Sequence, residues 1–508
     1  MPPSIRQIMV SKQILSTIRF VAGTKPVFHL SEIIPYLEES LSVEDLFKGI
    51  SPELERLGLA AQKKGGDYEI SRYSPQTAYV LNPEETARLT QFFEQRALPG
   101  LLQTSIEQYI AKKVGKDLTD PVLIERLRRA IVSQKDDYWK PQHKRVLRYV
   151  KGYSVLGYLA YHLPVYFMQT EYLLALLARE GRLKKSMTIL DVGTGPGVVP
   201  LAIADFYSRL DTAKADIYSL ERSEEHIEAF LTLRENCVPR GGKVSIKSPV
   251  KADIRSLDME ALPPKIDLAI FSNVLNELPD ATMEIQTGIV ARIAERLAPD
   301  GFILIVEPAD EENATRMRSL TVALHAKGLF IASPCSFIWG TPCTAPRCWS
   351  FKAEPAIKMT RLMETLARCE ESFRFVNTDI KYSYAILSKD PKTKEHCRLP
   401  AESKFIRFSK LTHHVEKRVN AAGVKMSGEL GSARNHVYKI CDGTAKTPVY
   451  AVLPSYHITP ENDAITKAPY GSLLEMKGVI VRYNKTHNAY NLLVSRNTII
   501  SGRNPDTP

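Results

Sequence analysis

The chain has 508 residues, of which 44% are hydrophobic and 25% are charged. These proportions are typical of globular proteins and exclude a fibrous repeat or a largely disordered chain. The longest apolar runs have the length of a strand, far below the roughly 20 residues of a membrane-spanning helix, so we expect no membrane association. At roughly 150 residues per domain, the length predicts about three structural units.

Lys and Arg outnumber Asp and Glu by 68 to 57, which gives a net charge of +11. This excess favours a polyanionic partner, with a basic surface that has no partner as the alternative. The first 31 residues hold four basic and no acidic side chains, as a transit peptide would, but residues 13–20 run straight into a folded segment. Because no secretory signal is visible, we expect a cytoplasmic protein, or a mitochondrial one if its source is eukaryotic.

The first 185 residues predict two mainly helical regions. In residues 1–75, apolar residues recur at helical spacing before a segment in which Gly65 and Gly66 separate two short strands. Helices followed by a hairpin fit a winged-helix module, and another small α+β cap is the alternative. Residues 76–185 predict further helices, and the segment 153–180 is the most amphipathic of them.

From Met187 onward, predicted strands alternate with predicted helices. The strands are short apolar runs, as expected for a parallel sheet covered on both faces. They lie at residues 188–192, 216–220, 266–271 and 302–306. Residues 186–331 therefore predict one doubly wound α/β domain.

Two regions follow this domain. Residues 332–465 contain a cluster of cysteines and a stretch, residues 380–430, with eleven basic and five acidic side chains, which predicts an exposed basic insert. Residues 466–508 alternate apolar and polar residues, which predicts a small β tail, either a strand pair or an OB-like unit.

A glycine-rich turn follows the first strand, in the segment Asp191-Val-Gly-Thr-Gly-Pro-Gly197. Glycine lets the backbone turn sharply and approach a ligand closely. Glu221 ends the next strand, where a carboxylate can accept hydrogen bonds from both hydroxyls of a ribose. Asp253, in Val250-Lys-Ala-Asp-Ile254, follows a further strand, the third in chain order before the fourth at residues 266–271, and is expected beside an adenine. The expected cofactor-binding residues are Asp191, Gly193, Thr194, Gly195, Gly197, Glu221, Asp253 and Asn273.

The spacing of these glycines separates two classes of cofactor. Dinucleotide enzymes usually show G-x-G-x-x-G, with a helix N-terminus facing the pyrophosphate. Here Asp191 precedes a G-x-G-x-G turn, which resembles the first motif of class I methyltransferases, the enzymes that bind S-adenosylmethionine. We therefore expect S-adenosylmethionine, with an NAD-type cofactor or an empty fold as the alternatives.

Asn273, Asn276 and Glu277 follow the fourth strand, at the edge where substrates enter such sheets. They are the candidates for positioning a methyl acceptor, and capping of the next helix is their alternative role. The segment has neither an Asn-Pro-Pro-Tyr motif for amino methylation nor a cysteine like that of 5-methylcytosine enzymes. The catalytic residues are thus unassigned, and the sequence leaves open whether methyl transfer occurs.

Three of the seven cysteines, Cys335, Cys343 and Cys348, lie within fourteen residues that also hold several prolines. Such a loop can bring several sulfur atoms onto one metal centre. The fourth ligand must come from elsewhere, and we favour Cys441, at the end of a predicted strand. The other candidates are Cys369 and Cys397. The wide spacing favours a 4Fe-4S cluster, with zinc or unligated thiols as the alternatives.

Together these elements resemble the methyltransferase-like assembly factors of the mitochondrial small ribosomal subunit and their archaeal and bacterial relatives. The resemblance extends from about Tyr153 to Val452. It is carried by residues 158–164, 191–197, 273–278, 305–308 and 382–386, the cysteine loop and Cys441. The family's loop has the form Ala-Pro-Cys-Pro-His, followed by two further cysteines, and a distant cysteine completes a 4Fe-4S centre. This chain departs from it with Ser336 and Phe337 in place of Pro and His.

The resemblance implies that the protein binds S-adenosylmethionine and acts on small-subunit ribosomal RNA or on the assembling small ribosomal subunit. Two hypotheses follow, an RNA methyltransferase and a non-catalytic assembly factor that binds RNA and the cofactor. A small-molecule methyltransferase with an N-terminal DNA-binding module is a third, which the basic stretch and the cysteines favour less. The sequence gives no indication of the oligomeric state.

Overall fold

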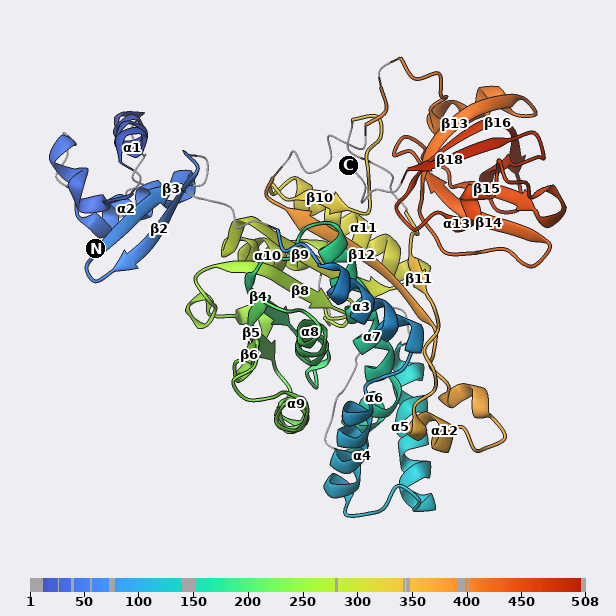
Figure 1. Cartoon of the computed structure of the whole chain (residues 1–508), viewed down its shortest axis with the longest axis horizontal. Coiled ribbons are helices and arrows are strands. Elements are labelled where there is room, and N and C mark those ends of the chain that lie inside the picture. Colours follow the sequence, from blue (N-terminus) through green and yellow to red (C-terminus); the bar gives the residue numbers. More distant parts are fainter. Residues whose placement is uncertain are drawn as a thin grey trace. The chain divides into compact units, whose positions relative to one another are not determined.

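The structure is a computed structural model of the chain (Figure 1). It describes residues 12–25, 27–37, 41–54, 57–72, 78–138, 152–278, 282–340, 343, 348–390, 398–400 and 402–503. The chain divides into two compact units, Met1–Thr77 and Ala78–Pro508. No helix in these ranges is both long enough and apolar enough to cross a bilayer.

The N-terminal unit combines helices with a small antiparallel sheet. Its elements are α1 (Lys12–Thr24), β1 (Val27–His29), two 3-10 turns (Leu30–Glu32 and Ile34–Tyr36), α2 (Val43–Leu54), β2 (Leu59–Lys64) and β3 (Asp67–Arg72). The strand order is β1-β3-β2. Lys64 pairs with Asp67 around Gly65 and Gly66, so the predicted hairpin is confirmed. Ile18 and Phe28 belong to the buried core of this unit. The winged-helix module stays a prediction.

The second unit begins with helices. They are α3 (Pro83–Gln95), α4 (Gly100–Val114), α5 (Pro121–Tyr138), α6 (Tyr153–Tyr161) and α7 (Leu163–Arg179). A capping box starts α3, because the Asn82 side chain accepts a hydrogen bond from the Glu85 N–H and the Glu85 carboxylate accepts one from the Asn82 N–H. Nearly every residue of α7 is buried. This helix is therefore part of the core beneath the sheet.

A nine-stranded sheet, counted over the described residues, organises the centre of this unit. Its order is β10-β12-β9-β8-β4-β5-β6, with β11 paired to β12 and β7 to β5. The strands are β4 (Ser186–Val192), β5 (Lys214–Glu221), β6 (Val244–Ile246), β7 (Val250–Lys251), β8 (Ile266–Ser272), β9 (Leu297–Pro308), β10 (Phe330–Ser333), β11 (Lys352–Glu354) and β12 (Ile380–Ser388). Neighbours from β6 to β9 run parallel, whereas β12 lies antiparallel between β9 and β10. This is the strand order of class I methyltransferases, so the predicted fold class is confirmed.

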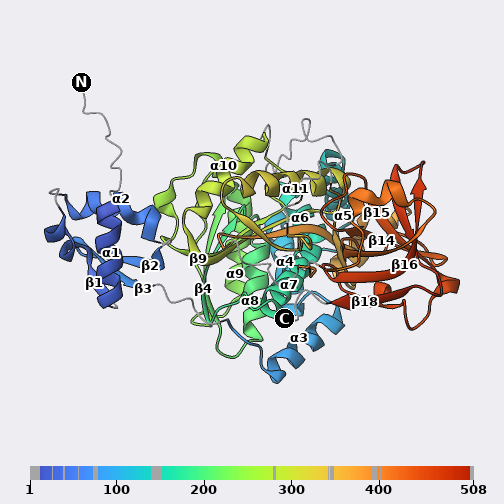
Figure 2. The ribbon, with the colours of Figure 1, turned by 90° about the horizontal axis from the view of Figure 1, so that it is seen from above.

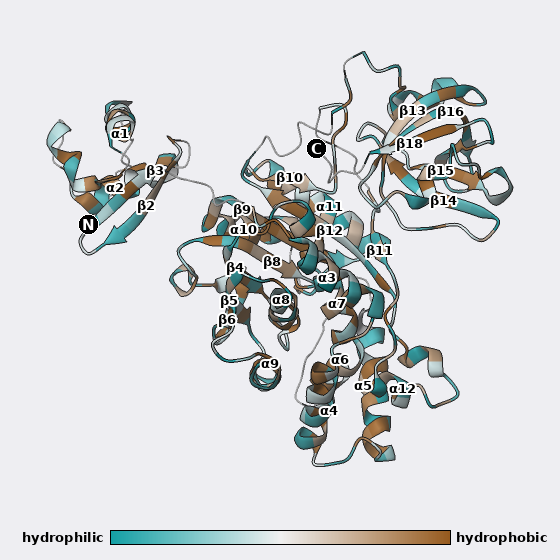
Figure 3. Cartoon of the chain, viewed as in Figure 1, coloured by the Kyte–Doolittle hydropathy of each residue, from teal (hydrophilic) through white to brown (hydrophobic). Residues whose placement is uncertain are grey.

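Helices cover both faces of the sheet (Figures 1 and 2). Besides α7 they include α8 (Val198–Ser208), α9 (Glu224–Cys237), α10 (Met283–Ala294) and α11 (Glu311–His325), whereas α12 (Arg361–Leu366) packs against α5 and α6. Successive residues of a strand point to opposite faces. Accordingly, Ile189 belongs to one apolar core and Leu190 to another. Every residue of β8 except Ser272 is buried, which explains why the strand is apolar apart from Asp267 and Ser272 (Figure 3).

The prediction of an exposed basic insert at residues 380–430 is wrong at its start. Residues 380–388 form β12, an almost completely buried strand in which Ser383 pairs with Glu307 of β9. The prediction rested on the composition of a long window, and the apolar strand at its beginning was averaged with the charged residues behind it. Residues 391–397 and 401 of this stretch lie outside the described residues.

The C-terminal part is a closed β barrel. Its elements are β13 (Arg418–Lys425), β14 (Asn435–Cys441), β15 (Val449–Pro454), α13 (Ala464–Lys467), β16 (Leu473–Asn484), β17 (Ala489–Leu493) and β18 (Ile499–Arg503). The strand order is β13-β14-β15-β17-β16-β18, and an additional pairing of β13 with β16 closes the barrel. β15 and β17 run parallel. This is the strand order of the OB fold.

The barrel begins at β13, well before residue 466, where the sequence predicts the β tail to start. Lys425 shows why basic residues misled the prediction. Its Nζ atom donates hydrogen bonds to the carbonyl oxygens of Ile465 and Ala468, at 2.9 and 2.8 Å, and lies 4.0 Å from the centre of the Tyr438 ring. Burial lowers the pKa of Lys425 to about 8. The composition suggests that this lysine lies on the surface, whereas in the structure it is buried and its hydrogen bonds stabilise the barrel.

Candidate functional site

The glycine-rich turn lies between β4 and α8. The N–H groups of Gly193 and Thr194 both donate to the carbonyl oxygen of Leu220, each at 2.9 Å, which holds the turn against the end of β5. Gly197 has a φ of 85°, in the left-handed region that favours glycine. A Cβ atom at Gly197 would lie 2.0 Å from Cδ2 of Phe230. The glycine at this position is therefore required by both backbone conformation and packing.

Glu221 is the last residue of β5, and its carboxylate faces the glycine-rich turn. Oε2 accepts a hydrogen bond from the N–H of Gly195 at 2.8 Å. Oε1 accepts hydrogen bonds from the N–H groups of Arg222 and Ser223 at 2.9 and 2.8 Å. These three donors fix the orientation of a group that has about four acceptor positions in all. The carboxylate can thus still accept a hydrogen bond from a ligand hydroxyl.

A cleft lies at the carboxyl ends of β4, β5 and β8. Of the expected cofactor-binding residues, Gly193, Gly195, Glu221, Asp253 and Asn273 line it. Asp191, Thr194 and Gly197 are not among the described residues that form its wall. The cleft encloses about 80 Å³, whereas ligand pockets usually measure at least about 300 Å³. A nucleoside can therefore enter only if side chains of the wall move.

Asp191 lies behind the turn with only 1% of its surface exposed. Its Oδ2 atom has no hydrogen-bond partner among the described residues. Burial raises the pKa of Asp191 to about 7, and the charge of Glu221 adds to the rise. A cation near this carboxyl would stabilise its ionised form and lower its pKa.

Asp253 lines the cleft at a separate point. It caps a short 3-10 turn by accepting a hydrogen bond from the Arg255 N–H, and its carboxylate forms an ion pair with the Arg255 side chain. These hydrogen bonds and this charge hold the pKa of Asp253 below its usual value. The carboxylate therefore stays ionised at neutral pH.

Two of the three catalytic candidates, Asn273 and Glu277, line the cleft, and Asn276 is not among the described lining residues. Asn273 has a φ of 54°, and its N–H donates to the carbonyl oxygen of Val306 at 2.9 Å. The side-chain nitrogen and oxygen of Asn276 are buried without a hydrogen-bond partner in the described part of the chain. Burial and the charge of Glu277 raise the pKa of the neighbouring Glu307 well above its usual value.

Sequence reasoning does not identify two residues of the cleft, Tyr158 and His226. The ring centres of these residues are 5.9 Å apart, and Nδ1 of His226 lies 3.9 Å from Oε1 of Glu221. Burial lowers the pKa of His226, so the imidazole is neutral at pH 7. Ser223 caps α9 by accepting a hydrogen bond from the His226 N–H, so the sequence could place His226 in the first turn of the helix that follows Glu221. Tyr158 carries no comparable local signal.

The four cysteines expected as metal ligands come together. Cys335, Cys343 and Cys348 lie between β10 and β11, and Cys441 ends β14. Burial raises the pKa of Cys441 well above its usual value, and charges on Cys348, Cys343 and Cys335 raise it further. A Cβ atom at Gly443, two residues beyond Cys441, would lie 4.0 Å from Cβ of Cys343. The loop and the barrel strand therefore face each other through their thiols.

The thiols provide the donor set of a thiolate-bound metal. However, no three His, Cys, Asp or Glu side chains in the described ranges are arranged so that they could hold a metal ion. Of the other candidates, Cys369 lies apart, with its Sγ atom 3.7 Å from the carbonyl oxygen of Leu366. Cys397 falls outside the described residues. The assignment of Cys335, Cys343, Cys348 and Cys441 as metal ligands therefore stays a prediction.

Two family models match the chain. One, described as mitochondrial small ribosomal subunit Rsm22, matches residues 152–434. The other, described as the C-terminal domain of a domain of unknown function (DUF8157), matches residues 409–502, which include the barrel. No curated protein matches the chain.

Several solved structures are similar to this chain. Magnesium protoporphyrin IX methyltransferase from Synechocystis PCC 6803 is 13% identical, with 55% of this chain and 100% of that chain covered and a TM-score of 0.29. NSun6 from Pyrococcus horikoshii is 15% identical, with 44% and 51% covered and a TM-score of 0.27. An S-adenosylmethionine-dependent methyltransferase from Clostridium acetobutylicum is 9% identical, with 44% and 91% covered and a TM-score of 0.27. These TM-scores are too low to support a fold assignment, so the assignment is based on the strand order of the central sheet.

Proposed function

Because the chain belongs to the mitochondrial small ribosomal subunit Rsm22 family, whose model spans residues 152–434, we propose that it is a methyltransferase-like protein of the small ribosomal subunit. It binds S-adenosylmethionine and acts on small-subunit ribosomal RNA or on the assembling subunit, in the cytoplasm or, in a eukaryote, in mitochondria. The observation that carries the proposal is the meeting of the Gly195 backbone with the Glu221 carboxylate at the cleft.

Different residues of the cleft bind different parts of the cofactor. Glu221 accepts a hydrogen bond from a ribose hydroxyl, while the glycine-rich turn lets the main chain approach the methionine end of the cofactor. Asp253 lies at the adenine end, and Asp191 provides a negative charge behind the turn. The bound cofactor supplies a methyl group on a sulfonium. Asn273 and Glu277 position the acceptor, since methyl transfer depends mainly on alignment of the reacting atoms.

A non-catalytic assembly factor is the second candidate function. Two observations favour it: the segment Ser272–Leu278 holds no known acceptor motif, and the cleft is narrow. In this case the cofactor stabilises a shape that RNA recognises. Mapping of ribosomal RNA methylation in a deletion strain and in a strain carrying Glu221→Gln separates the two candidates. Loss of one modification in both strains indicates an enzyme, whereas unchanged modification with stalled small subunits indicates a factor.

Replacing Glu221 by glutamine is expected to weaken binding of S-adenosylmethionine about 10- to 100-fold, because hydrogen bonds to a charged group contribute roughly 1.5–3 kcal/mol. Isothermal titration calorimetry on the full-length protein measures the change. Glu235→Gln, which alters an exposed carboxylate on α9, is the matched control and should bind as the wild type does. Equal affinities of both variants would contradict the assignment of Glu221.

We further propose that Cys335, Cys343, Cys348 and Cys441 hold a 4Fe-4S cluster, with zinc as the alternative. Four thiolates suit either group. The four cysteines come from two parts of the chain, the loop before β11 and strand β14. This supports a structural role, because a metal centre bound by all four would fasten the barrel to the methyltransferase-like domain. The departures Ser336 and Phe337 lie beside Cys335 and leave all four thiols in place.

Anaerobically purified protein is expected to absorb visible light and to contain about four irons per chain. Cys441→Ser should lose the iron and the colour, because a deprotonated thiol is the ligand. Cys369→Ser, which removes a thiol outside this cluster, should keep both. Elemental analysis that finds zinc without iron would reject the cluster, and the absence of both metals would reject a metal centre altogether.

A further inference from the structure

One face of the OB-fold barrel carries a groove. On β14, Tyr438 and Ile440 belong to the barrel core, while Val437 and Lys439, which alternate with them, point away from that core and line the groove. The outward residues of β14, β15 and β17 line the groove, which encloses about 1020 Å³. It is much larger than the cofactor cleft, and the two share no lining residue among those described.

The groove offers the chemical groups that a polynucleotide needs. Lys446 is exposed at its edge, and residues 418–503, which form the barrel, hold eleven Lys and Arg residues against five Asp and Glu residues. Lysine side chains neutralise phosphates. Tyr450, on β15, presents a partly exposed aromatic ring on which a base can stack. Side-chain amides that can read base edges come from Asn435, Asn484, Asn488 and Asn491.

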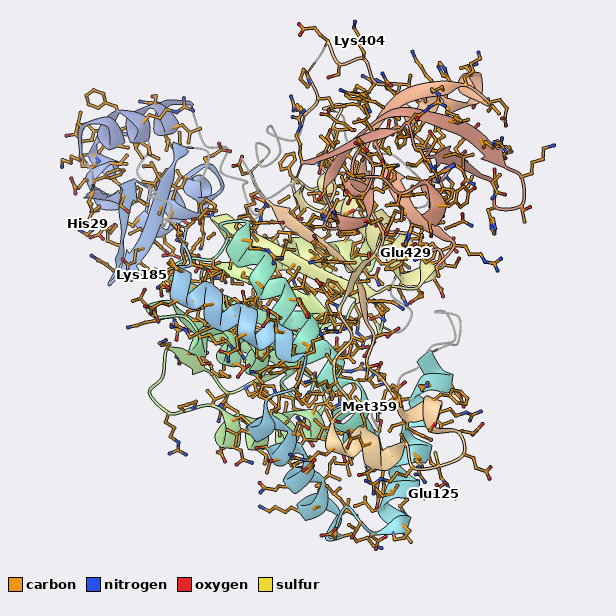
Figure 4. The ribbon with its side chains drawn as sticks, turned by 45° about the vertical axis from the view of Figure 1, so that its right-hand side comes forward. His29, Glu125, Lys185, Met359, Lys404 and Glu429 are labelled. Carbon is orange, nitrogen blue, oxygen red and sulfur yellow. The ribbon has the colours of Figure 1, made fainter. Side chains whose placement is uncertain are left out.

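The loop between β13 and β14 is held in place at one end of the groove. Glu429, labelled in Figure 4, lies in this loop and precedes Leu430, which lines the groove. Its Oε1 atom accepts hydrogen bonds from the N–H groups of Gly431 and Val437 at 2.8 Å, and its Oε2 atom lies 2.8 Å from Nδ1 of His436. A loop fixed in this way loses little conformational entropy when a ligand binds.

Trp349, which follows the cysteine loop, also lines the groove. Trp349 follows Cys348, and its Nε1–H group donates to the carbonyl oxygen of Ala309 at 2.7 Å. The ammonium group of Lys439 donates to the carbonyl oxygen of Trp349. Glu311, at the start of α11, is the acidic member among the described residues of the wall. The groove therefore lies between the barrel and the methyltransferase-like domain.

We propose that this groove binds a single-stranded segment of RNA, with Tyr450 as the stacking platform and Lys446 as a phosphate contact. The inference rests on the proposed function and adds the place where the RNA is held. Barrels with this strand order bind oligonucleotides on the face of their second and third strands, which are β14 and β15 here. Bases in a duplex are stacked on one another and cannot stack on a tyrosine, so the groove selects unpaired RNA.

Fluorescence anisotropy of the full-length protein with a labelled, unstructured oligoribonucleotide tests the proposal. Tyr450→Ala is expected to weaken binding about ten-fold or more. Lys446→Glu should weaken binding and make it less dependent on salt. Tyr456→Ala and Lys477→Glu change exposed residues of the same types outside the lining and are the matched controls. Circular dichroism and thermal unfolding establish that each variant is folded.

Photocrosslinking of the wild type with a 4-thiouridine oligonucleotide provides a second measurement, with crosslinks expected in residues 435–454 and 484–493. If the wild type binds RNA and the Tyr450 and Lys446 variants bind it equally well, the groove is not the RNA-binding site. The proposal that the protein acts on RNA is then unaffected. A duplex that binds as tightly as the single strand also refutes the groove. If no RNA binds but a ribosomal protein does, the groove and the RNA-directed function both fail. Loss of S-adenosylmethionine binding alone contradicts only the proposed function.

Discussion

Replacing Gly197 by alanine is expected to destabilise the methyltransferase-like domain by more than about 4 kcal/mol, enough to prevent accumulation of folded protein. The added Cβ atom would lie 2.0 Å from Cδ2 and 2.5 Å from Cε2 of Phe230, a side chain with no exposed surface. The φ of 85° adds the strain of a left-handed conformation. Thermal unfolding of the purified variant, or its absence from the soluble fraction, measures the effect.

Gly115→Ala separates these two causes. Gly115 ends α4 with a φ of 67°, but a Cβ atom there would meet nothing within 4 Å. This variant should therefore cost only the conformational strain, about 1 kcal/mol. In addition, Phe230→Ala combined with Gly197→Ala should cost less than the sum of the two single changes, because the clash disappears. Additive costs would show that Phe230 is not the obstacle.

Asp191→Asn is expected to remove a pH dependence of stability in the ligand-free protein. The pKa of Asp191 is about 7 in the folded chain, against an ordinary value of 3.8. Between these values the folded state holds a proton that the unfolded state has lost, so the contribution of Asp191 to stability is full below pH 4 and is lost as the pH rises through 7. From pH 5 to pH 8 this loss is about 3 kcal/mol for the wild type. Urea unfolding at both pH values, followed by circular dichroism, should show a smaller loss in the variant.

The same carboxyl should couple proton release to cofactor binding. The sulfonium favours the ionised form of Asp191, so S-adenosylmethionine should bind the wild type more tightly at pH 8 than at pH 6. S-adenosylhomocysteine lacks the positive charge at sulfur and should show a weaker pH dependence. In Asp191→Asn, the difference between the two ligands should no longer vary with pH. Identical pH profiles of wild type and variant would refute a role for this charge.

The central sheet could be predicted because its strands are buried on both faces. Such strands consist mostly of apolar residues, as at residues 268–271 of β8, and the glycines between β4 and α8 mark the first turn of the domain. The barrel was harder to delimit, because its strands are partly exposed and contain lysines. Lys425 and Lys439 are both buried, and their ammonium groups donate to backbone carbonyl oxygens. Composition alone cannot distinguish such a lysine from one on the surface.

The residues of the candidate site, too, could be predicted only in part from the sequence. Gly195 and Glu221 could be predicted to meet, because adjacent parallel strands end at the same edge of a sheet. Tyr158 reaches the cleft from a helix that precedes the sheet in the chain, so its position depends on tertiary packing. Likewise, Asn276 follows the same strand as Asn273 but is not among the described lining residues, because neighbouring residues of a turn point in different directions. The ends of the predicted strands therefore identify the edge of the sheet where the cleft lies. Which side chains reach the cleft depends on tertiary packing.

The four thiols come from two parts of the chain that are far apart in sequence, the loop before β11 and the second strand of the barrel. During synthesis, Cys335, Cys343 and Cys348 emerge from the ribosome long before Cys441. A chain that ends prematurely, before β14, would expose three thiols without their fourth neighbour and would be open to oxidation and to quality-control proteases. The fourth thiol therefore reaches this group only once β14 has been synthesised.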